Sequence, residues 1–166
     1  MEPESLGNLI DQLADALVLF ARSRCDEPED VVQDAFMKLA SQTKPPRNPA
    51  AWLFRTVRNG AVNAGIASQR RRRREAEAGA TKADWFEPQP SAGSVFAVDP
   101  ESAQVALDAL PVEQREIIVA RLWGGLTFEQ IANLTETSSS SAHRLYQAGL
   151  VTLRARLGVP CRTNPS

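Results

Sequence analysis

Arginine dominates the middle of this 166-residue chain. Residues 47–75 hold eight arginines against one acid, Glu75, and five of the arginines are consecutive, Arg70, Arg71, Arg72, Arg73 and Arg74. A guanidinium stays charged at physiological pH, and its planar set of N–H donors matches the oxygens of a phosphate. Adjacent like charges repel one another, and binding to a polyanion offsets that repulsion. The run therefore predicts contact with a nucleic-acid backbone.

A second set of polar side chains, near the C-terminus, is able to bind base edges and phosphates. Its members are Ser138, Ser139, Ser140, Ser141, His143, Arg144 and Gln147. They begin the second of two predicted helices, residues 128–134 and 139–157, which a polar turn at 135–137 joins. Thr127 and Gln130 have the spacing of a capping box, and Ser138 is placed to cap the second helix. This pattern predicts a DNA-binding helix-turn-helix.

Three predicted helices carry the arginine run. Apolar residues at three- and four-residue steps indicate an amphipathic helix from about Ser5 to Arg24. An acidic amphipathic helix should begin near Pro28 and end in the proline-containing segment 41–47. The third helix should start after Asn48, a good N-cap, and continue into the arginines.

Composition divides the chain into parts. Residues 76–98 contain proline, glycine and small residues without periodicity, which predicts a flexible linker, and the roles of Trp85 and Phe86 within it stay open. Helical signals resume at residue 99, with helices expected at about 100–110 and 112–123 before the helix-turn-helix. We therefore expect an all-α protein. Its parts are a helical domain (1–75), a linker (76–98), a helix-turn-helix domain (99–158) and a tail (159–166).

Other functional classes find little support in the sequence. Cys25 and Cys161 lie far apart and have no metal-ligand or disulfide spacing. No glycine-rich phosphate loop and no nucleophile beside a base is evident, so we expect a protein that is not an enzyme and that needs no cofactor or metal. The acidic start of the chain is unlike a secretion signal, and no apolar run could insert into a membrane. A cytoplasmic location is the prediction.

The order of these motifs resembles the extracytoplasmic-function (ECF) sigma factors, the initiation subunits of bacterial RNA polymerase. Residues 29–36 (EDVVQDAF) look like the acidic core-binding helix of that family, and residues 52–59 (WLFRTVRN) look like the start of its −10-binding helix. Residues 110–118 (LPVEQREII), 125–132 (GLTFEQIA) and the serine-rich turn into His143 resemble its C-terminal domain. The resemblance implies an all-α fold of two sigma domains joined by a linker.

The resemblance also implies a function and partners. The chain would bind core RNA polymerase, direct it to the −10 and −35 elements of promoter DNA, and be held by an anti-sigma factor. The polymerase-binding residues implied are Glu29, Asp30, Gln33, Asp34 and Phe36, with the alternative that Phe36 belongs to the core of the helical bundle. Those implied for the −10 element are Arg47, Asn48, Arg55, Arg58, Asn59 and Asn63, together with the arginine run. The polar set in the helix-turn-helix would read the −35 element.

Some features depart from the family pattern, and two alternatives stay open. The loop before Trp52 is compact and proline-rich, Asn63 stands where aspartate is common, and the recognition helix holds fewer basic residues than usual. One alternative is a helix-turn-helix regulator that binds DNA unaided. The other is an adaptor whose charged faces contact proteins only.

Overall fold

The computed structural model describes residues 3–79 and 100–158, and the regular elements in those two ranges are helices. The helices are α1 (Pro3–Ala21), α2 (Pro28–Ala40), α3 (Pro49–Glu77), α4 (Pro100–Asp108), α5 (Val112–Leu122), α6 (Phe128–Thr135) and α7 (Ser139–Leu157). No strand occurs in the described parts, so the predicted all-α class is confirmed. None of the helices in these ranges combines the length and the apolar character that crossing a bilayer requires.

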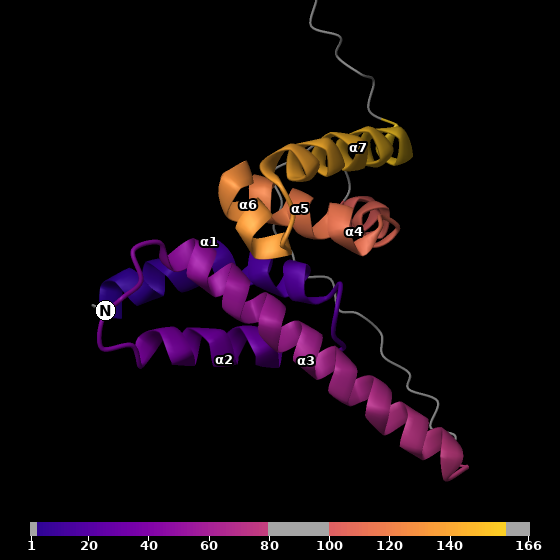
Figure 1. Cartoon of the computed structure of the whole chain (residues 1–166), viewed down its shortest axis with the longest axis horizontal. Coiled ribbons are helices and arrows are strands. Elements are labelled where there is room, and N and C mark those ends of the chain that lie inside the picture. The colour runs from indigo at the N-terminus through magenta and orange to yellow at the C-terminus, as the bar shows by residue number, and fades with distance from the viewer. Residues whose placement is uncertain (1–2, 80–99, 159–166) are drawn as a thin grey trace, which may run out of the picture.

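The first three helices pack around one apolar centre. The stripe predicted for α1 is buried at Leu13, Leu17 and Phe20, and the ring of Phe20 meets that of Phe54 of α3 edge to face at 5.0 Å between centroids. In α2 every third or fourth residue is buried, including Val32 and Leu39. Figure 1 shows α2 alongside the first half of α3, while the arginine-bearing end of α3 projects beyond the other helices.

The four C-terminal helices pack together, and the last two of them, α6 and α7, form the helix-turn-helix. Ile131 and Leu134 of α6 and Ala142 of α7 are buried, as their spacing predicts. Gly149 lets α7 approach α5 closely, since a Cβ there would lie 2.6 Å from Cδ1 of Ile118. Tight packing of this kind fixes the orientation of α7 on the rest of the group.

The two groups of helices share a core in this structure. Val119, Ala120 and Leu126 of the C-terminal group belong to the same buried cluster as Phe20 and Phe54 of the N-terminal group. Figure 1 shows α5 and α6 resting on the side of α1 and α3 that faces away from α2. The two groups are therefore in apolar contact where these residues meet.

The predicted helix boundaries agree with the structure to within a few residues, and the differences at three helix ends have local causes or consequences. The first helix ends at Ala21 rather than Arg24, because the chain turns there and the Arg24 amide bonds to the Ala21 carbonyl at 2.9 Å. The helix expected at 100–110 ends at Asp108. Residues 76 and 77, assigned to the linker, still belong to α3. The rest of that segment, with Trp85 and Phe86, and the tail 159–166 lie almost wholly outside the described residues.

Candidate polymerase and nucleic-acid interfaces

Helix α2 presents an acidic face to solvent. Pro28 occupies the first turn, and Glu29 and Asp30 follow it, where negative charge complements the N-terminal end of the helix dipole. The predicted residues Glu29, Asp30, Gln33 and Asp34 are all exposed. Asp34 pairs with Lys38 one turn later, at 2.6 Å. The face therefore keeps a net negative charge that a basic partner can meet.

The fifth predicted polymerase-binding residue, Phe36, is placed differently. It is only 8% exposed and belongs to the core, yet it also lines an apolar groove of about 460 Å³ between α1 and α2. The groove adjoins the acidic face, because Glu29 and Gln33 line it as well. Sequence reasoning did not predict the contributions of Ile10 and Met37, which are large apolar side chains left exposed at its rim. The sequence signal for their role was their position at the edge of the apolar stripes of α1 and α2, where a side chain is left exposed.

Helix α3 begins with a well-formed cap. The Asn48 side-chain oxygen accepts a hydrogen bond from the Ala51 amide at 3.0 Å, which confirms the predicted N-cap. Arg47 and Asn48 are exposed in the loop that enters the helix. Pro49 supports the start, since it lacks only an N–H that the first turn does not use.

A line of exposed polar residues follows one side of α3. We call it the α3 ridge, and it consists of Arg55, Asn59, Asn63, Arg70 and Arg74. At 3.6 residues per turn these positions fall on one strip of the helix surface. Seven of the predicted −10 contacts therefore lie together, five on the ridge and two in the loop before it.

Two other arginines of the run pair with carboxylates. Arg72 pairs with Asp26 at 2.8 Å, and Arg73 lies 3.6 Å from Glu77. Within the described residues Arg70, Arg71 and Arg74 form no ion pair. These three cations are therefore the ones whose charge is locally uncompensated.

The helix-turn-helix has the predicted local geometry. Thr127 and Gln130 form a reciprocal capping box, with hydrogen bonds of 3.2 and 2.9 Å. Glu136 ends α6 in the left-handed conformation at φ 58°, and the Ser138 hydroxyl accepts from the Ser141 amide at 3.1 Å. These caps fix the angle at which α7 leaves the turn.

The start of α7 carries the predicted recognition side chains. Ser139, Ser140, His143, Arg144 and Gln147 are exposed. Ser138 and Ser141 also bond to each other at 2.9 Å, so their hydroxyls serve the cap. The ring of His143 packs edge to face on Phe128 at 4.9 Å between centroids, which orients the imidazole on the outside of the helix pair.

A buried carboxylate lies between the two groups of helices, and sequence reasoning missed it. Glu116 of α5 is 1% exposed and accepts two hydrogen bonds from Arg24, at 2.5 and 3.0 Å. The hydrogen bond to Glu116 raises the pKa of the Arg24 guanidinium above its usual value, despite partial burial. Arg58, predicted to contact DNA, is 19% exposed and lies 3.5 Å from the same carboxylate.

Burial of Glu116 requires these partners, because an unpaired carboxylate inside a protein is strongly destabilising. An acid followed directly by Ile117 and Ile118 in a helix was the sequence signal for a buried charge. Among the described residues no group of three or more His, Cys, Asp or Glu side chains is arranged to hold a metal ion.

Comparison with known proteins accounts for both groups of helices. The family profile Sigma-70 region 2 matches residues 9–75, and Sigma-70, region 4 matches residues 101–153. Over 121 residues the chain is 30% identical to a protein described as ECF RNA polymerase sigma factor EcfG from Rhodopseudomonas palustris. That alignment covers 70% of this chain but 64% of the relative, slightly less than two thirds of its length.

Two solved structures share the fold. The sigma factor RpoE, in a co-crystal with the anti-sigma factor NepR from Bartonella quintana, superposes with a TM-score of 0.62 and 22% identity, covering 94% of this chain and 98% of that one. CnrH, in complex with the cytosolic domain of CnrY, superposes with a TM-score of 0.57 and 23% identity, covering 95% and 90%. The chain belongs to the sigma-70 family, and within it to the ECF sigma factors.

Proposed function

We propose that this protein is a transcription initiation factor that binds core RNA polymerase and directs it to promoter DNA. The observation that carries the proposal is the placement of exposed faces on a region 2 and region 4 framework. An acidic face with an apolar groove lies on α2, and cationic and polar faces lie on α3 and α7. One chain thus offers separate surfaces to a protein and to DNA.

The polymerase would dock on α2. Glu29, Asp30, Gln33 and Asp34 form its charged part, and the α1–α2 groove adds an apolar part in which Phe36 forms one wall. Charge at the rim speeds encounter with a basic partner, while burial of apolar side chains supplies affinity. A partner with a basic and apolar surface suits this combination.

Promoter DNA would meet the other faces. The α3 ridge, with Arg47 and Asn48, suits the −10 element, where bases leave the duplex stack and are held as a single strand. The exposed start of α7 suits the major groove at the −35 element. Because that helix holds Arg144 as its one cation between Ser138 and Gln147, its own affinity should be low and depend on tethering to polymerase.

We further propose an anti-sigma factor as a second partner, a cytoplasmic location and a non-catalytic role. One structural neighbour was solved with the anti-sigma factor NepR, which supports the first proposal, and the other was solved with the cytosolic domain of CnrY. The chain would act as two domains, residues 1–75 and residues 99–158, which the 76–98 linker joins. Catalysis would belong to the polymerase.

Transcription in a purified system tests the proposal. Core polymerase with this protein should initiate at defined start sites on genomic templates, and core alone should not. The protein should also co-purify with core and bind promoter fragments poorly by itself. Specific binding of duplex DNA by the pure protein would favour an autonomous regulator, and failure in both assays would favour an adaptor.

A further inference from the structure

The turn between α1 and α2 is held by acids from the C-terminal group. Arg22 and Arg24 lie in this turn, residues 22–26, and each faces a carboxylate of another part of the fold. Arg24 makes its two hydrogen bonds to Glu116, and Arg22 lies 3.9 Å from Asp108 at the end of α4. With Arg58, three guanidinium groups of the N-terminal group meet two carboxylates of the C-terminal group.

These contacts do not satisfy all of the arginines. The Arg58 Nε atom is buried and has no hydrogen-bond partner among the described residues, although Glu116 lies within ion-pair distance. Arg22 meets Asp108 at the outer limit of an ion pair, and Asp108 bonds to Arg115 of its own group at 3.3 Å. The two carboxylates are therefore shared among more arginines than they can fully neutralise.

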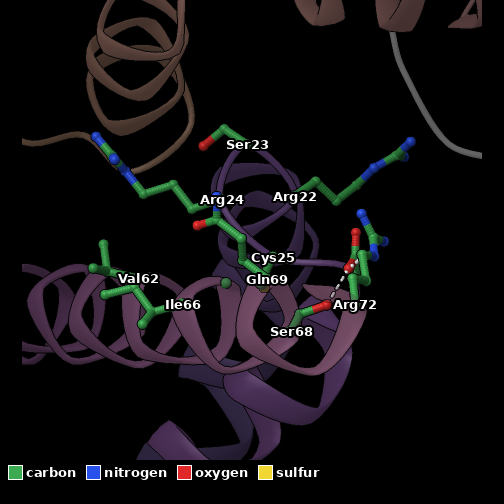
Figure 2. A pocket seen from close by; sticks show the side chains of 11 residues that line it. Arg22, Ser23, Arg24, Cys25, Val62, Ile66, Ser68, Gln69 and Arg72 are labelled. Atoms are coloured by element: carbon green, nitrogen blue, oxygen red, sulfur yellow. Dashed lines mark hydrogen bonds and ion pairs between the residues drawn. The ribbon is translucent and has the colours of Figure 1, made fainter. Parts of the chain in front are cut away.

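The turn is fixed beside the arginine-bearing part of α3. Gly65 permits this, because a Cβ at that position would overlap the Arg24 carbonyl oxygen. On the same side, Ser68 and Arg72 of α3 both bond to Asp26 at 2.8 Å, which ties the end of the turn to the helix. Figure 2 shows Arg22 and Arg24 extending away from α3 on opposite sides of the turn, with Ser68 and Arg72 below them.

A hollow of about 600 Å³ lies between the turn and α3. Its polar lining includes Arg22, Arg24, Gln69 and Arg72, and Asp26 is the acid in that lining. Arg72 is the member of the arginine run that lines this hollow. A DNA strand that reached the side of α3 carrying Arg72 would thus pass the turn.

We propose that Arg22 and Arg24 are contacts for the DNA backbone, and that Asp108 and Glu116 occupy the places of phosphates while the two groups of helices are packed together. A guanidinium binds a carboxylate and a phosphate with the same paired N–H geometry, so one can replace the other. When α4 and α5 move away from the turn, Arg22, Arg24 and Arg58 become available together. The packed chain therefore hides part of its DNA-binding charge. This inference rests on the proposed function and extends it to a site outside the α3 ridge.

Binding of the purified full-length chain to a 30-base-pair duplex of arbitrary sequence tests the inference, since phosphate contacts do not depend on sequence. Anisotropy titrations over a range of salt concentrations give the slope of log affinity against log salt. The variant Asp108→Asn/Glu116→Gln keeps side-chain shape and removes both carboxylate charges. Its slope should be steeper than that of the parent chain by up to about 2.7, at about 0.9 for each of three released arginines.

Two further variants show which residues cause the change in slope. Adding Arg22→Gln and Arg24→Gln to the double variant should remove about 1.8 of the added slope. Glu101→Gln/Glu129→Gln is the matched control, because it removes two exposed acids elsewhere in the C-terminal group and should leave the slope near that of the parent. Equal slopes for the double variant and this control would overturn the inference, as would a steep slope that persists without Arg22 and Arg24.

If the variant at Glu116 does not fold, Asp108 alone still provides a test of the inference. Asp108 and Arg22 are both exposed, so Asp108→Asn should fold and steepen the slope by about 0.9, and adding Arg22→Gln should reverse it. An unchanged slope in Asp108→Asn would then overturn the inference. The experiment uses neither polymerase nor promoter. Its failure is thus distinct from failure of the proposed function, which appears as absent initiation with core polymerase.

Discussion

Replacing Arg70 and Arg74 with glutamine tests whether the α3 ridge follows a DNA backbone. Both side chains are exposed, lie one turn apart on the ridge and form no ion pair among the described residues. Each should therefore neutralise one phosphate when DNA binds. Loss of two such contacts should flatten the slope of log affinity against log salt by about 1.8.

The size of the effect follows from counterion release. Between 50 and 200 mM salt, affinity of the parent chain for a duplex should fall by about 12-fold more than affinity of the Arg70→Gln/Arg74→Gln variant. Fluorescence anisotropy with a labelled duplex measures both curves. The far-ultraviolet circular dichroism of the two proteins should agree, because glutamine is also a good helix former.

The matched control removes the same charge elsewhere. Arg154→Gln/Arg156→Gln affects two exposed arginines in the last turn of α7, away from every predicted contact. Its salt slope should match that of the parent chain. If the ridge variant and the control gave parallel curves, the reasoning that places DNA along α3 would be refuted.

Three further predictions concern other parts of the fold. Asp30→Lys/Asp34→Lys should abolish co-purification with core polymerase and leave the melting temperature nearly unchanged, since both residues are exposed on α2; retained co-purification would contradict the docking face. Gly65→Ala should destabilise the protein by about 1–3 kcal/mol in chemical denaturation, because its Cβ would overlap a backbone carbonyl of the α1–α2 turn, whereas Gly7→Ala, with open space around it, should be neutral or stabilising. Burial raises the pKa of the Cys25 thiol, so in a chain whose other cysteine is replaced by serine, alkylation at pH 8 should be slower than in denaturant; equal rates would show that the thiol is open to solvent.

Local signals predicted the helices well, because each depends on residues close together in the chain. Asn48, Thr127 and Ser138 cap their helices as their types and spacing indicate. Pro28 begins α2 for the same kind of reason, since a proline is compatible with the first turn of a helix. The family resemblance also followed from contiguous motifs, and the family profiles confirm it.

The functional faces were predicted only in part. Which arginines of the run stay uncompensated depends on Asp26, which lies more than forty residues before Arg72 in the chain and 2.8 Å from it in space. Phe36 was predicted to contact polymerase and proves to be mostly buried, with the groove beside it shared with Ile10 and Met37. These outcomes depend on how α1, α2 and α3 pack.

The sequence by itself determined the helices, their caps, the alternation of acidic and basic segments and the family, since periodicity and charge order are written along the chain. Only the tertiary structure decided that Glu116 is buried between Arg24 and Arg58, and that the two groups of helices share a core around Phe54. The physical reason is that a buried ion pair is set by the meeting of surfaces distant in sequence. No local pattern specifies which charges will be removed from water together.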